Sequence, residues 1–452
     1  MQLQFIGATG TVTGSKYLLQ VDKKHFLVDC GLFQGLKQLR LRNWNPLPIP
    51  PKAIEAVILT HAHIDHSGYL PLLVKNGFRG KIYCTRGTRT LCEILLPDAG
   101  HLQEEDASFA NKHRFSKHHP ALPLYTEEDA ILCLKYFESV PWHKQINLAR
   151  HLSFHFEPAG HILGAASIQF SNQKTRLTFS GDLGRPKQIM MPPPSSQHDT
   201  DYLVVESTYG GRRHPPENPR EILKNFINPT LKRGGIVLIP AFAVGRAQEV
   251  LYLLTQLKKN KEIPNVPIHL NSPMAIQATR LCSSFVGEHK LTEEECQEID
   301  HSTHFVTTID ESKRLNTLHE PSIIISASGM AEGGRILHHL KVLAPHPKNL
   351  ILFVGFQAAG TRGEAMVNGA TQVKIHGSMI PVRAQVELLE SLSAHADENE
   401  IAGWLKKFPS RPKMTFITHG EPEACQQMKK KIESELHWKC TVPHYLDTFS
   451  LS

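Results

Sequence analysis

A dense cluster of potential metal ligands constrains this chain more than any other feature. The run THAHIDH (60–66) follows an apolar, strand-like segment and carries His61, His63, Asp65 and His66. Residues two apart in extended backbone point the same way, so His61 and His63 would share one side, while Asp65 and His66 would begin a helix and face a second position. Imidazole and carboxylate donors without a thiolate suit zinc with open positions. The spacing therefore predicts two adjacent metal ions at the end of a buried strand.

Several other apolar runs share this form, in which a β-branched stretch ends in a polar or acidic tip. Such runs are typical of buried strands whose working end is the C-terminal edge. The runs are HFLVDCG (25–31), AVILTHAH (56–63), LTFSGDLG (177–184), YLVVESTYG (202–210) and MTFITHGE (414–421). A pair of metals needs further donors, and strand ends offer them: Asp182 and His419 at two of these tips, and His161 in PAGHILGA.

The middle of the chain follows another plan, a strand, a glycine-bearing loop and an amphipathic helix. Residues 234–257, 321–343 and 348–366 each read this way. Such units build parallel sheets, and their helix N-termini present N–H groups suited to phosphate. No P-loop or dinucleotide fingerprint is present, so we expect no nucleotide cofactor. The simplest organisation is a host domain, 1–206 with 389–452, interrupted by an insert at 207–388.

Taken together, these motifs resemble a known family. Asp29, the HAHIDH run, His161, Asp182 and a C-terminal histidine resemble the five motifs of the metallo-β-lactamase superfamily. Glu206 in VVEST, His395 in SAHAD and His419 in THGE look like the three further motifs of its β-CASP branch, which contains the mRNA 3′-end processing endonuclease and related bacterial ribonucleases. Three segments of the insert, PAFAVGRAQE, SGMAEGGR and GFQAAGTRG, are also similar to that branch. The resemblance implies an α/β fold, a metallo-β-lactamase αββα sandwich with an inserted α/β β-CASP domain.

The resemblance also implies a ligand set for two Zn²⁺ ions, with manganese as an alternative. One zinc would be bound by His61, His63, His161 and Asp182, and the other by Asp65, His66, Asp182 and His419, so that Asp182 bridges them. Asp29 would orient the ligand loop from behind.

The reaction implied is hydrolysis of a phosphodiester. Two zincs about 3.5–4 Å apart would activate a hydroxide for in-line attack on phosphorus. His395 would protonate the leaving 3′ oxygen, with Glu206 holding its imidazole. We count Asp65 among the catalytic residues as well as the ligands.

Single-stranded RNA is the expected substrate. In the resembled family a histidine in the last motif, here His419, is typical of the RNA enzymes, whereas the DNA-repair enzymes usually have valine there. A single strand would lie in a cleft between host and insert, with its phosphates contacted by Arg246, Arg335, Arg362 and Ser393. The chain carries no KH-like module or long C-terminal region after its last motif, which favours endonucleolytic cleavage in a compact, bacterial-type form. A DNA nuclease, a small-molecule thioesterase or lactonase, and an inactive RNA-binding scaffold are the alternatives.

Composition adds weaker constraints. The net charge of +7 favours an anionic partner without naming one. The eight scattered cysteines form no Cys-x-x-Cys pair, so we expect reduced, buried thiols and no cysteine zinc knuckle. The first residues lack a secretory pattern, and the longest apolar runs are too short to cross a bilayer. We therefore expect a cytoplasmic protein that contacts no membrane, and we keep a homodimer as a candidate assembly.

Overall fold

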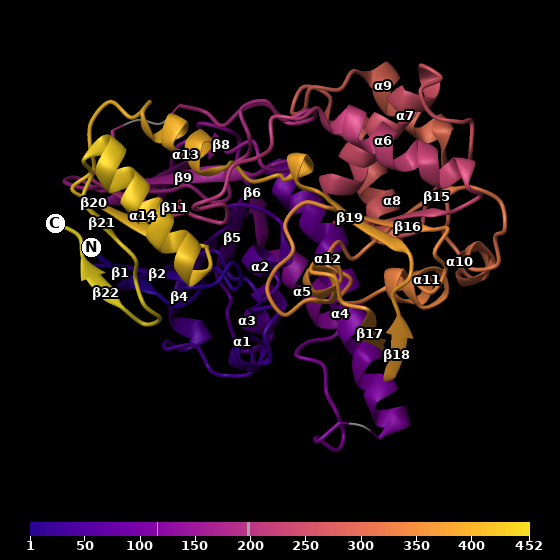
Figure 1. Ribbon diagram of the computed structural model, residues 1–452. Helices are drawn as coiled ribbons and strands as arrows, with labels where there is room; N and C mark the ends of the chain where they lie inside the picture. Colours follow the sequence, from indigo (N-terminus) through magenta and orange to yellow (C-terminus); the bar gives the residue numbers. More distant parts are fainter. Residues whose placement is uncertain (115, 197–198) are drawn as a thin grey trace. The chain divides into compact units, whose positions relative to one another are not determined.

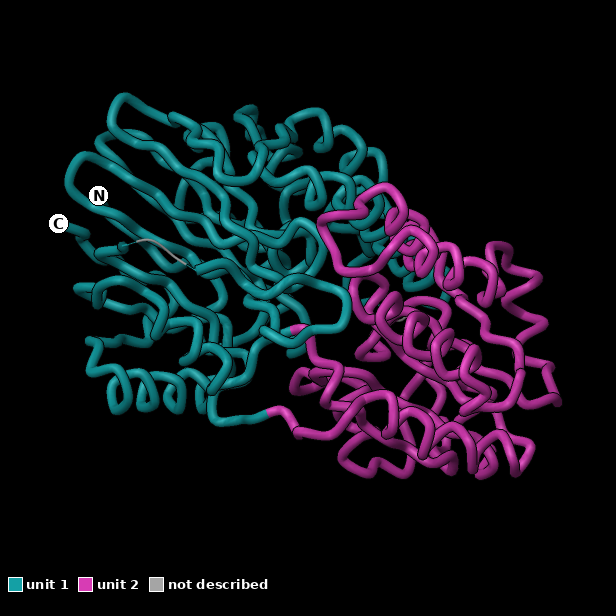
Figure 2. Tube along the Cα trace, turned by 90° about the horizontal axis from the view of Figure 1, so that it is seen from above, with its two compact units in different colours: residues 1–213, 395–452 teal, residues 214–394 magenta. Residues whose placement is uncertain are grey.

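Two compact units make up the protein. The computed structural model describes residues 1–114, 116–196 and 199–452. Unit 1 comprises residues 1–213 and 395–452, and unit 2 comprises residues 214–394 (Figure 2). These limits lie a few residues beyond the expected joins at 206/207 and 388/389.

Unit 1 is built on two seven-stranded sheets within the described residues. The first has the order β22 (Thr448–Ser450), β1 (Gln2–Phe5), β2 (Tyr17–Val21), β3 (Lys24–Val28), β4 (Ile54–Ile58), β5 (Lys81–Cys84) and β6 (Phe137–Ser139). The second has the order β21 (Cys440–Thr441), β20 (Met414–Thr418), β11 (Tyr202–Glu206), β10 (Arg176–Phe179), β9 (Ala166–Ser171), β8 (Leu152–Pro158) and β7 (Ile146–Ala149).

An apolar core joins the two sheets face to face. Phe5 and Ile58 from the first sheet and Phe154, Phe179 and Phe416 from the second all belong to one buried cluster. Because side chains alternate along a strand, the intervening residues face the outer sides of the sandwich. Those outer sides are also buried, which requires helices over both sheets.

The helices of unit 1 supply this cover. They are α1 (Lys37–Arg42), α2 (Ile64–Ser67), α3 (Leu70–Lys75), α4 (Arg86–His113), α5 (Glu127–Cys133), α13 (Glu398–Leu405) and α14 (Pro422–Leu436), with 3₁₀ turns η1 (Pro51–Ala53) and η2 (Leu134–Tyr136). Helix α4 packs against α2, α5 and β6 on the side of the first sheet. Helices α13 and α14 cover the second sheet, where Trp404 and Met428 meet Leu203 and Ile417 of β11 and β20 (Figure 1). The result is the expected αββα sandwich.

Unit 2 has a parallel sheet, as the strand–loop–helix pattern predicted. Its strands, in spatial order, are β14 (Thr303–Phe305), β13 (Ile268–Leu270), β15 (Ile323–Ser326), β12 (Val237–Pro240), β16 (Leu350–Val354) and β19 (Gln385–Leu389), and every pairing is parallel. A hairpin of β17 (Gln372–Ile375) and β18 (Ser378–Pro381) lies apart from it. The helices are α6 (Pro219–Lys232), α7 (Arg246–Lys259), α8 (Pro273–Arg280), α9 (Glu293–Ser302), α10 (Ile309–Leu315), α11 (Arg335–Leu343) and α12 (Arg362–Val367), with turns η3 (Cys282–Phe285) and η4 (Glu390–Leu392).

None of the helices in the described parts of the chain combines the length and the apolar character that crossing a membrane requires.

Candidate metal centre

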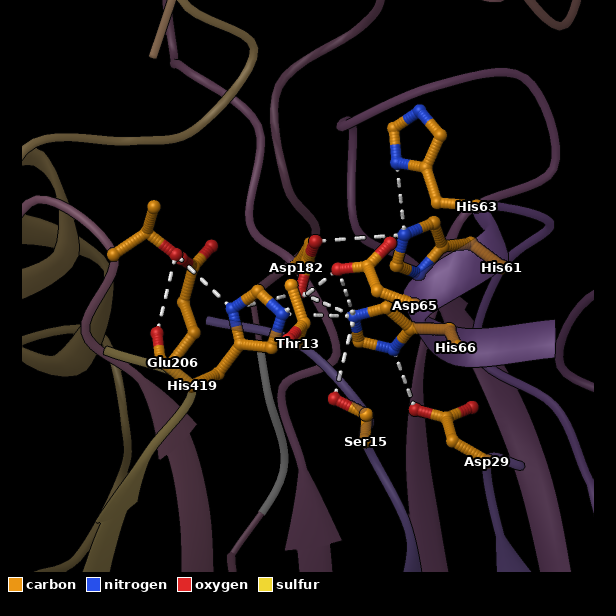
Figure 3. A network of polar contacts seen from close by, with 12 residues as sticks. Thr13, Ser15, Asp29, His61, His63, Asp65, His66, Asp182, Glu206 and His419 are labelled. Carbon is orange, nitrogen blue, oxygen red and sulfur yellow. Dashed lines mark hydrogen bonds and ion pairs between the residues drawn. The ribbon is translucent and has the colours of Figure 1, made fainter. Parts of the chain in front are cut away.

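The ends of neighbouring parallel strands bring the predicted ligands of unit 1 together. In the first sheet β3 and β4 run parallel, and Asp29 and the HAHIDH run follow their ends. In the second sheet β10, β11 and β20 run parallel, and their ends lead to Asp182, Glu206 and His419. Because carboxyl ends of parallel strands share one edge of a sheet, side chains far apart in sequence converge there (Figure 3).

The first group of donors surrounds one oxygen of Asp182. Ligand atoms of His61, His63, His161 and Asp182 all lie within 4.8 Å of one another. Asp182 Oδ2 lies 3.4 Å from His61 Nε2 and 3.7 Å from His161 Nε2. The Nδ1 atom of His63 is 3.1 Å from His61 Nε2 and 3.2 Å from His161 Nε2. Three imidazole nitrogens and one carboxylate oxygen thus converge on a common point.

The second group faces the other oxygen of the same carboxylate. Asp65, His66 and His419 also offer ligand atoms within 4.8 Å of one another. The Nε2 atoms of His66 and His419 are 3.0 Å apart, and His419 Nε2 is 3.3 Å from Asp65 Oδ2. Asp182 Oδ1 lies 3.2 Å from His66 Nε2 and 3.7 Å from His419 Nδ1. Asp182 therefore lies between the two groups and turns one carboxylate oxygen toward each (Figure 3).

Glycines allow the loops that carry these donors to approach so closely. A β-carbon on Gly31 would lie 1.6 Å from the carbonyl oxygen of Asp65, and one on Gly184 would lie 1.8 Å from that of Gly160. The first contact holds the HAHIDH loop against the loop after β3. The second holds the loop bearing His161 against the one bearing Asp182. Any side chain at Gly31 or Gly184 would push the donors apart.

The charge states of the donors fit a cation. Burial lowers the pKa of His61 well below its ordinary value and that of His63 to about 4, so both rings present nitrogen lone pairs. Burial also opposes the proton of His66, but Asp182 and Asp29 outweigh it and raise the pKa of His66 well above its ordinary value. Burial opposes ionisation of Asp182, but neighbouring imidazoles, led by that of His419, hold its pKa well below its usual range. A buried carboxylate ringed by imidazoles is a donor set that fits a divalent metal, which would displace the His66 proton on binding.

Residues behind the ligands fix their orientation. Asp29 Oδ2 lies 2.8 Å from His66 Nδ1, and Asp29 Oδ1 accepts the Thr60 backbone N–H at 2.7 Å. The Thr208 hydroxyl contacts His419 Nδ1 at 3.1 Å. The sequence indicated this role for Asp29 but missed Thr60 and Thr208. Their only signal is position, since each adjoins a strand tip that carries a predicted site residue.

His395 and Glu206 form a pair beside the donors. His395 Nδ1 lies 3.0 Å from Glu206 Oε2, and its Nε2 lies 3.9 Å from Asp182 Oδ2. The ring centroid of His395 is 4.5 Å from that of His161. Burial disfavours the His395 proton, but the charge and hydrogen bond of Glu206 dominate and raise the pKa of His395. Backbone pairing with Gly184 ties this histidine to the loop after β10.

The four expected phosphate contacts belong to unit 2. Arg246, Arg335 and Arg362 each begin a helix, α7, α11 and α12. Each guanidinium already has partners within that unit, and Arg246 pairs with Glu249. Ser393 follows η4 and is buried.

The partners of the other two arginines are mostly backbone carbonyls. Arg335 donates to Asn271 Oδ1 at 2.8 Å and to the Val306 carbonyl at 3.1 Å. Arg362 donates to the Lys374 carbonyl at 2.7 Å. A contact with phosphate by any of these arginines stays a prediction.

Three protein-family models match successive parts of the chain. They are the metallo-beta-lactamase superfamily over residues 9–223, the Beta-Casp domain over residues 247–366, and the Zn-dependent metallo-hydrolase RNA specificity domain over residues 379–443. The first covers most of the amino-terminal part of unit 1, and the second lies inside unit 2.

Relatives match over nearly the whole chain. Ribonuclease TTHA0252 of Thermus thermophilus is 36% identical over 438 residues, covering 94% of each chain. Transcription termination factor FttA of Pyrococcus abyssi is 31% identical over 99% of this chain and 70% of its own. An RNase J-like protein of Methanocaldococcus jannaschii is 30% identical over 93% of this chain and 92% of its own.

The fold also matches a solved structure. A protein of unknown function from Enterococcus faecalis V583 superposes with a TM-score of 0.52 at 13% identity, covering 100% of this chain and 99% of that one. That likeness concerns the fold alone. The family matches confirm the expected sandwich with its insert, and together with the relatives they confirm the expected class of metal-dependent hydrolase. The chain belongs to the β-CASP branch of the metallo-β-lactamase superfamily.

Proposed function

We propose that this protein hydrolyses phosphodiester bonds within single-stranded RNA, using two zinc ions bound in unit 1. The observation that carries the proposal is the carboxylate of Asp182, whose two oxygens face two separate groups of donors, at 3.4 Å from His61 and 3.2 Å from His66. A carboxylate placed in this way suits a dinuclear centre better than a single ion.

Each ion has a complete set of protein ligands in this proposal. His61, His63 and His161 would hold one zinc, and Asp65, His66 and His419 the other, with Asp182 shared. Bound zinc supplies Lewis acidity toward the phosphate oxygens and lowers the pKa of a coordinated water to about 7. The limits of host and insert at 206/207 and 388/389 remain part of this proposal.

His395 would carry the proton that the leaving oxygen needs. A carboxylate can only accept, so Glu206 takes the Nδ1–H of His395 and fixes the ring with Nε2 turned toward Asp182. Burial opposes the proton, but the charge and hydrogen bond of Glu206 raise the pKa of His395, which favours a proton on that Nε2. A histidine so placed can act as a general acid, while Glu206 positions it and stabilises its charge.

The choice of RNA rests on the last part of the chain. Residues 379–443 match the RNA specificity domain, and this stretch contains both His395 and His419. The relatives named as ribonucleases match almost all of the chain, so by similarity we extend their substrate class to it. Cleavage at internal positions is the mode that we propose.

The first experiment is a cleavage assay on matched strands. Zinc-loaded protein is incubated with a 5′-labelled single-stranded RNA and with the DNA of the same sequence. His395→Ala and Asp182→Ala are run beside wild type, and His151→Ala, at an exposed histidine away from the cluster, is the control.

We expect internal RNA fragments from wild type and His151→Ala, little cleavage of DNA, and no fragments from Asp182→Ala. Products released only from one end would replace endonucleolytic cleavage with an exonuclease mode. Preferential cleavage of DNA would overturn the substrate. Cleavage of neither strand by a zinc-loaded, folded protein would refute the proposed activity.

A further inference from the structure

A second cluster of potential metal ligands lies within unit 2. Cys282, His289 and Cys296 bring their ligand atoms within 4.8 Å of one another. Cys282 begins η3, His289 lies in the following loop, and Cys296 is in the second turn of α9. The three residues are only 8%, 9% and 3% exposed. No residue of this cluster belongs to the donor set in unit 1.

The ring of His289 is oriented as a metal ligand would be. Its Nε2 lies 2.8 Å from the carbonyl oxygen of Cys282. Because a carbonyl only accepts, Nε2 carries the proton and donates it, which leaves the lone pair on Nδ1. That Nδ1 is buried and has no hydrogen-bond partner among the described residues. A histidine that binds metal through one nitrogen commonly donates its other N–H to a backbone carbonyl, as His289 does here.

The two thiols are poised as a pair. The sulfur atoms of Cys282 and Cys296 lie within 4.8 Å of each other, and both side chains are buried. Both thiols would bind an ion as thiolates and release their protons on binding. In tetrahedral zinc with bonds of about 2.3 Å, two sulfurs lie roughly 3.8 Å apart, so the cluster needs little adjustment to close around an ion.

The local fold holds these three residues in place. The amino end of α9 is fixed by a capping box, in which the Thr292 hydroxyl accepts the Glu295 N–H and the Glu295 carboxylate accepts the Thr292 N–H. The loop before it is closed by a bridge between Val286 and His289. An ion bound here would therefore link η3 to α9 through three residues of one short segment.

We propose that Cys282, His289 and Cys296 bind one zinc ion as a structural site in unit 2. Two thiolates and an imidazole select zinc over magnesium or calcium, which prefer oxygen ligands. Water or Asp300, one helical turn after Cys296 on the same face of α9, would take the fourth position. The absence of a Cys-x-x-Cys pair excluded a zinc knuckle from the sequence. The three ligands are seven residues apart in the sequence and meet only through the turn, the loop and the helix, so no short motif indicates the site.

Cobalt substitution tests this site apart from the centre in unit 1. The full chain is purified under reductant, and its metals are exchanged for Co²⁺. The donors in unit 1 are nitrogen and oxygen atoms, so thiolate-to-cobalt charge-transfer absorption in the near ultraviolet reports cysteine ligation alone. We expect this absorption in wild type and Asp182→Ala. It should be lost in Cys296→Ser and His289→Ala, and kept in Cys440→Ser, a buried cysteine of unit 1.

Metal analysis gives a second readout. Zinc per chain should fall by about one equivalent in Cys296→Ser but not in Cys440→Ser, because only the first variant loses a ligand. Wild type without the charge-transfer absorption would overturn the proposal whether or not any variant folds. A Cys282–Cys296 disulfide found by mass spectrometry in the protein as isolated, with zinc content equal in wild type and Cys296→Ser, would also overturn it. Neither outcome bears on the activity proposed for unit 1.

Discussion

Replacing His395 with alanine should slow cleavage of an ordinary phosphodiester far more than cleavage of one whose leaving atom needs no proton. The His395 ring is held 3.0 Å from Glu206, which is 2% exposed, and its Nε2 faces the donors. Proton donation by a positioned side chain contributes about 10²–10⁴-fold. At about 1.36 kcal/mol for each tenfold change, this loss corresponds to about 2.7–5.4 kcal/mol of transition-state stabilisation.

A sulfur substitution at the leaving atom measures this directly. A short RNA with one mapped cleavage site is made with either oxygen or sulfur at the scissile 3′ position. A thiol ionises with a pKa of about 8.5, far below that of an alcohol, so the thiolate leaves without a proton. Under single-turnover conditions, His395→Ala should lose about 10²–10⁴-fold on the oxygen substrate and less than about tenfold on the sulfur substrate. Glu206→Gln should follow the same pattern with smaller losses.

The comparison separates proton donation from a structural role. Asp182→Ala should cleave neither substrate, because the two proposed ions lose the carboxylate that they share. His151→Ala should behave as wild type on both. If His395→Ala loses the same factor on oxygen and sulfur, the histidine acts through positioning or metal affinity, and its assignment as general acid is wrong.

The structure also predicts effects on metal affinity, on stability and on the pH dependence of stability. Asp29→Asn should weaken zinc binding about 10–100-fold in chelator competition, because Asp29 orients His66 from 2.8 Å; an unchanged affinity would refute that role. Gly184→Ala should destabilise unit 1 by about 1–3 kcal/mol and lower its metal content, since the new methyl meets the Gly160 carbonyl; a denaturation midpoint equal to wild type would contradict it. Burial lowers the pKa of His339 to about 4 from 6.5, so the unfolded chain takes up this proton first as pH falls. Stability should then drop by about 3 kcal/mol between pH 6.5 and 4, and His339→Gln should flatten that part of the curve, as followed by thermal unfolding.

The strand tips made much of unit 1 predictable from the sequence. LTFSGDLG and MTFITHGE are apolar runs with one polar end, and they form β10 and β20 with Asp182 and His419 just beyond. A buried strand can be recognised in the sequence because the core requires apolar residues along it. The end of such a strand can be recognised because a buried charged group there must have a function or a partner. The parallel sheet of unit 2 was equally legible from its repeated strand–loop–helix plan.

The positions at which the chain passes between the two units were harder to predict from the sequence. The sequence placed the first join at the end of β11, where the apolar run stops. Unit 1 continues to Arg213 because the turn after β11 packs on α14, where a β-carbon on Gly210 would lie 2.0 Å from the Ala424 carbonyl oxygen. This contact is between residues far apart in the sequence, so no local sequence pattern predicts it.

Side-chain partners were the least predictable feature. Arg335 follows a glycine loop at the start of a helix, which favours a phosphate contact. In the fold it donates to Asn271 Oδ1, and the same amide donates to His339 Nε2 at 2.6 Å. His339 in turn donates through Nδ1 to Asn316 at 2.7 Å. A chain of buried polar groups therefore depends on this arginine, so lost activity in Arg335→Ala would not by itself indicate phosphate binding.

The proposed metal ions would also stabilise the fold, because their ligands come from both sheets of unit 1. His61 and His66 follow β4 of the first sheet, whereas Asp182 and His419 follow β10 and β20 of the second. The apolar core joins the faces of these sheets, but at this edge polar donors replace it. Ions bound there would link the two sheets, so the same ligands would serve stability and catalysis. A ligand at 100 times its Kd stabilises the folded state by about 2.7 kcal/mol, and a chelator would remove that stabilisation along with the activity.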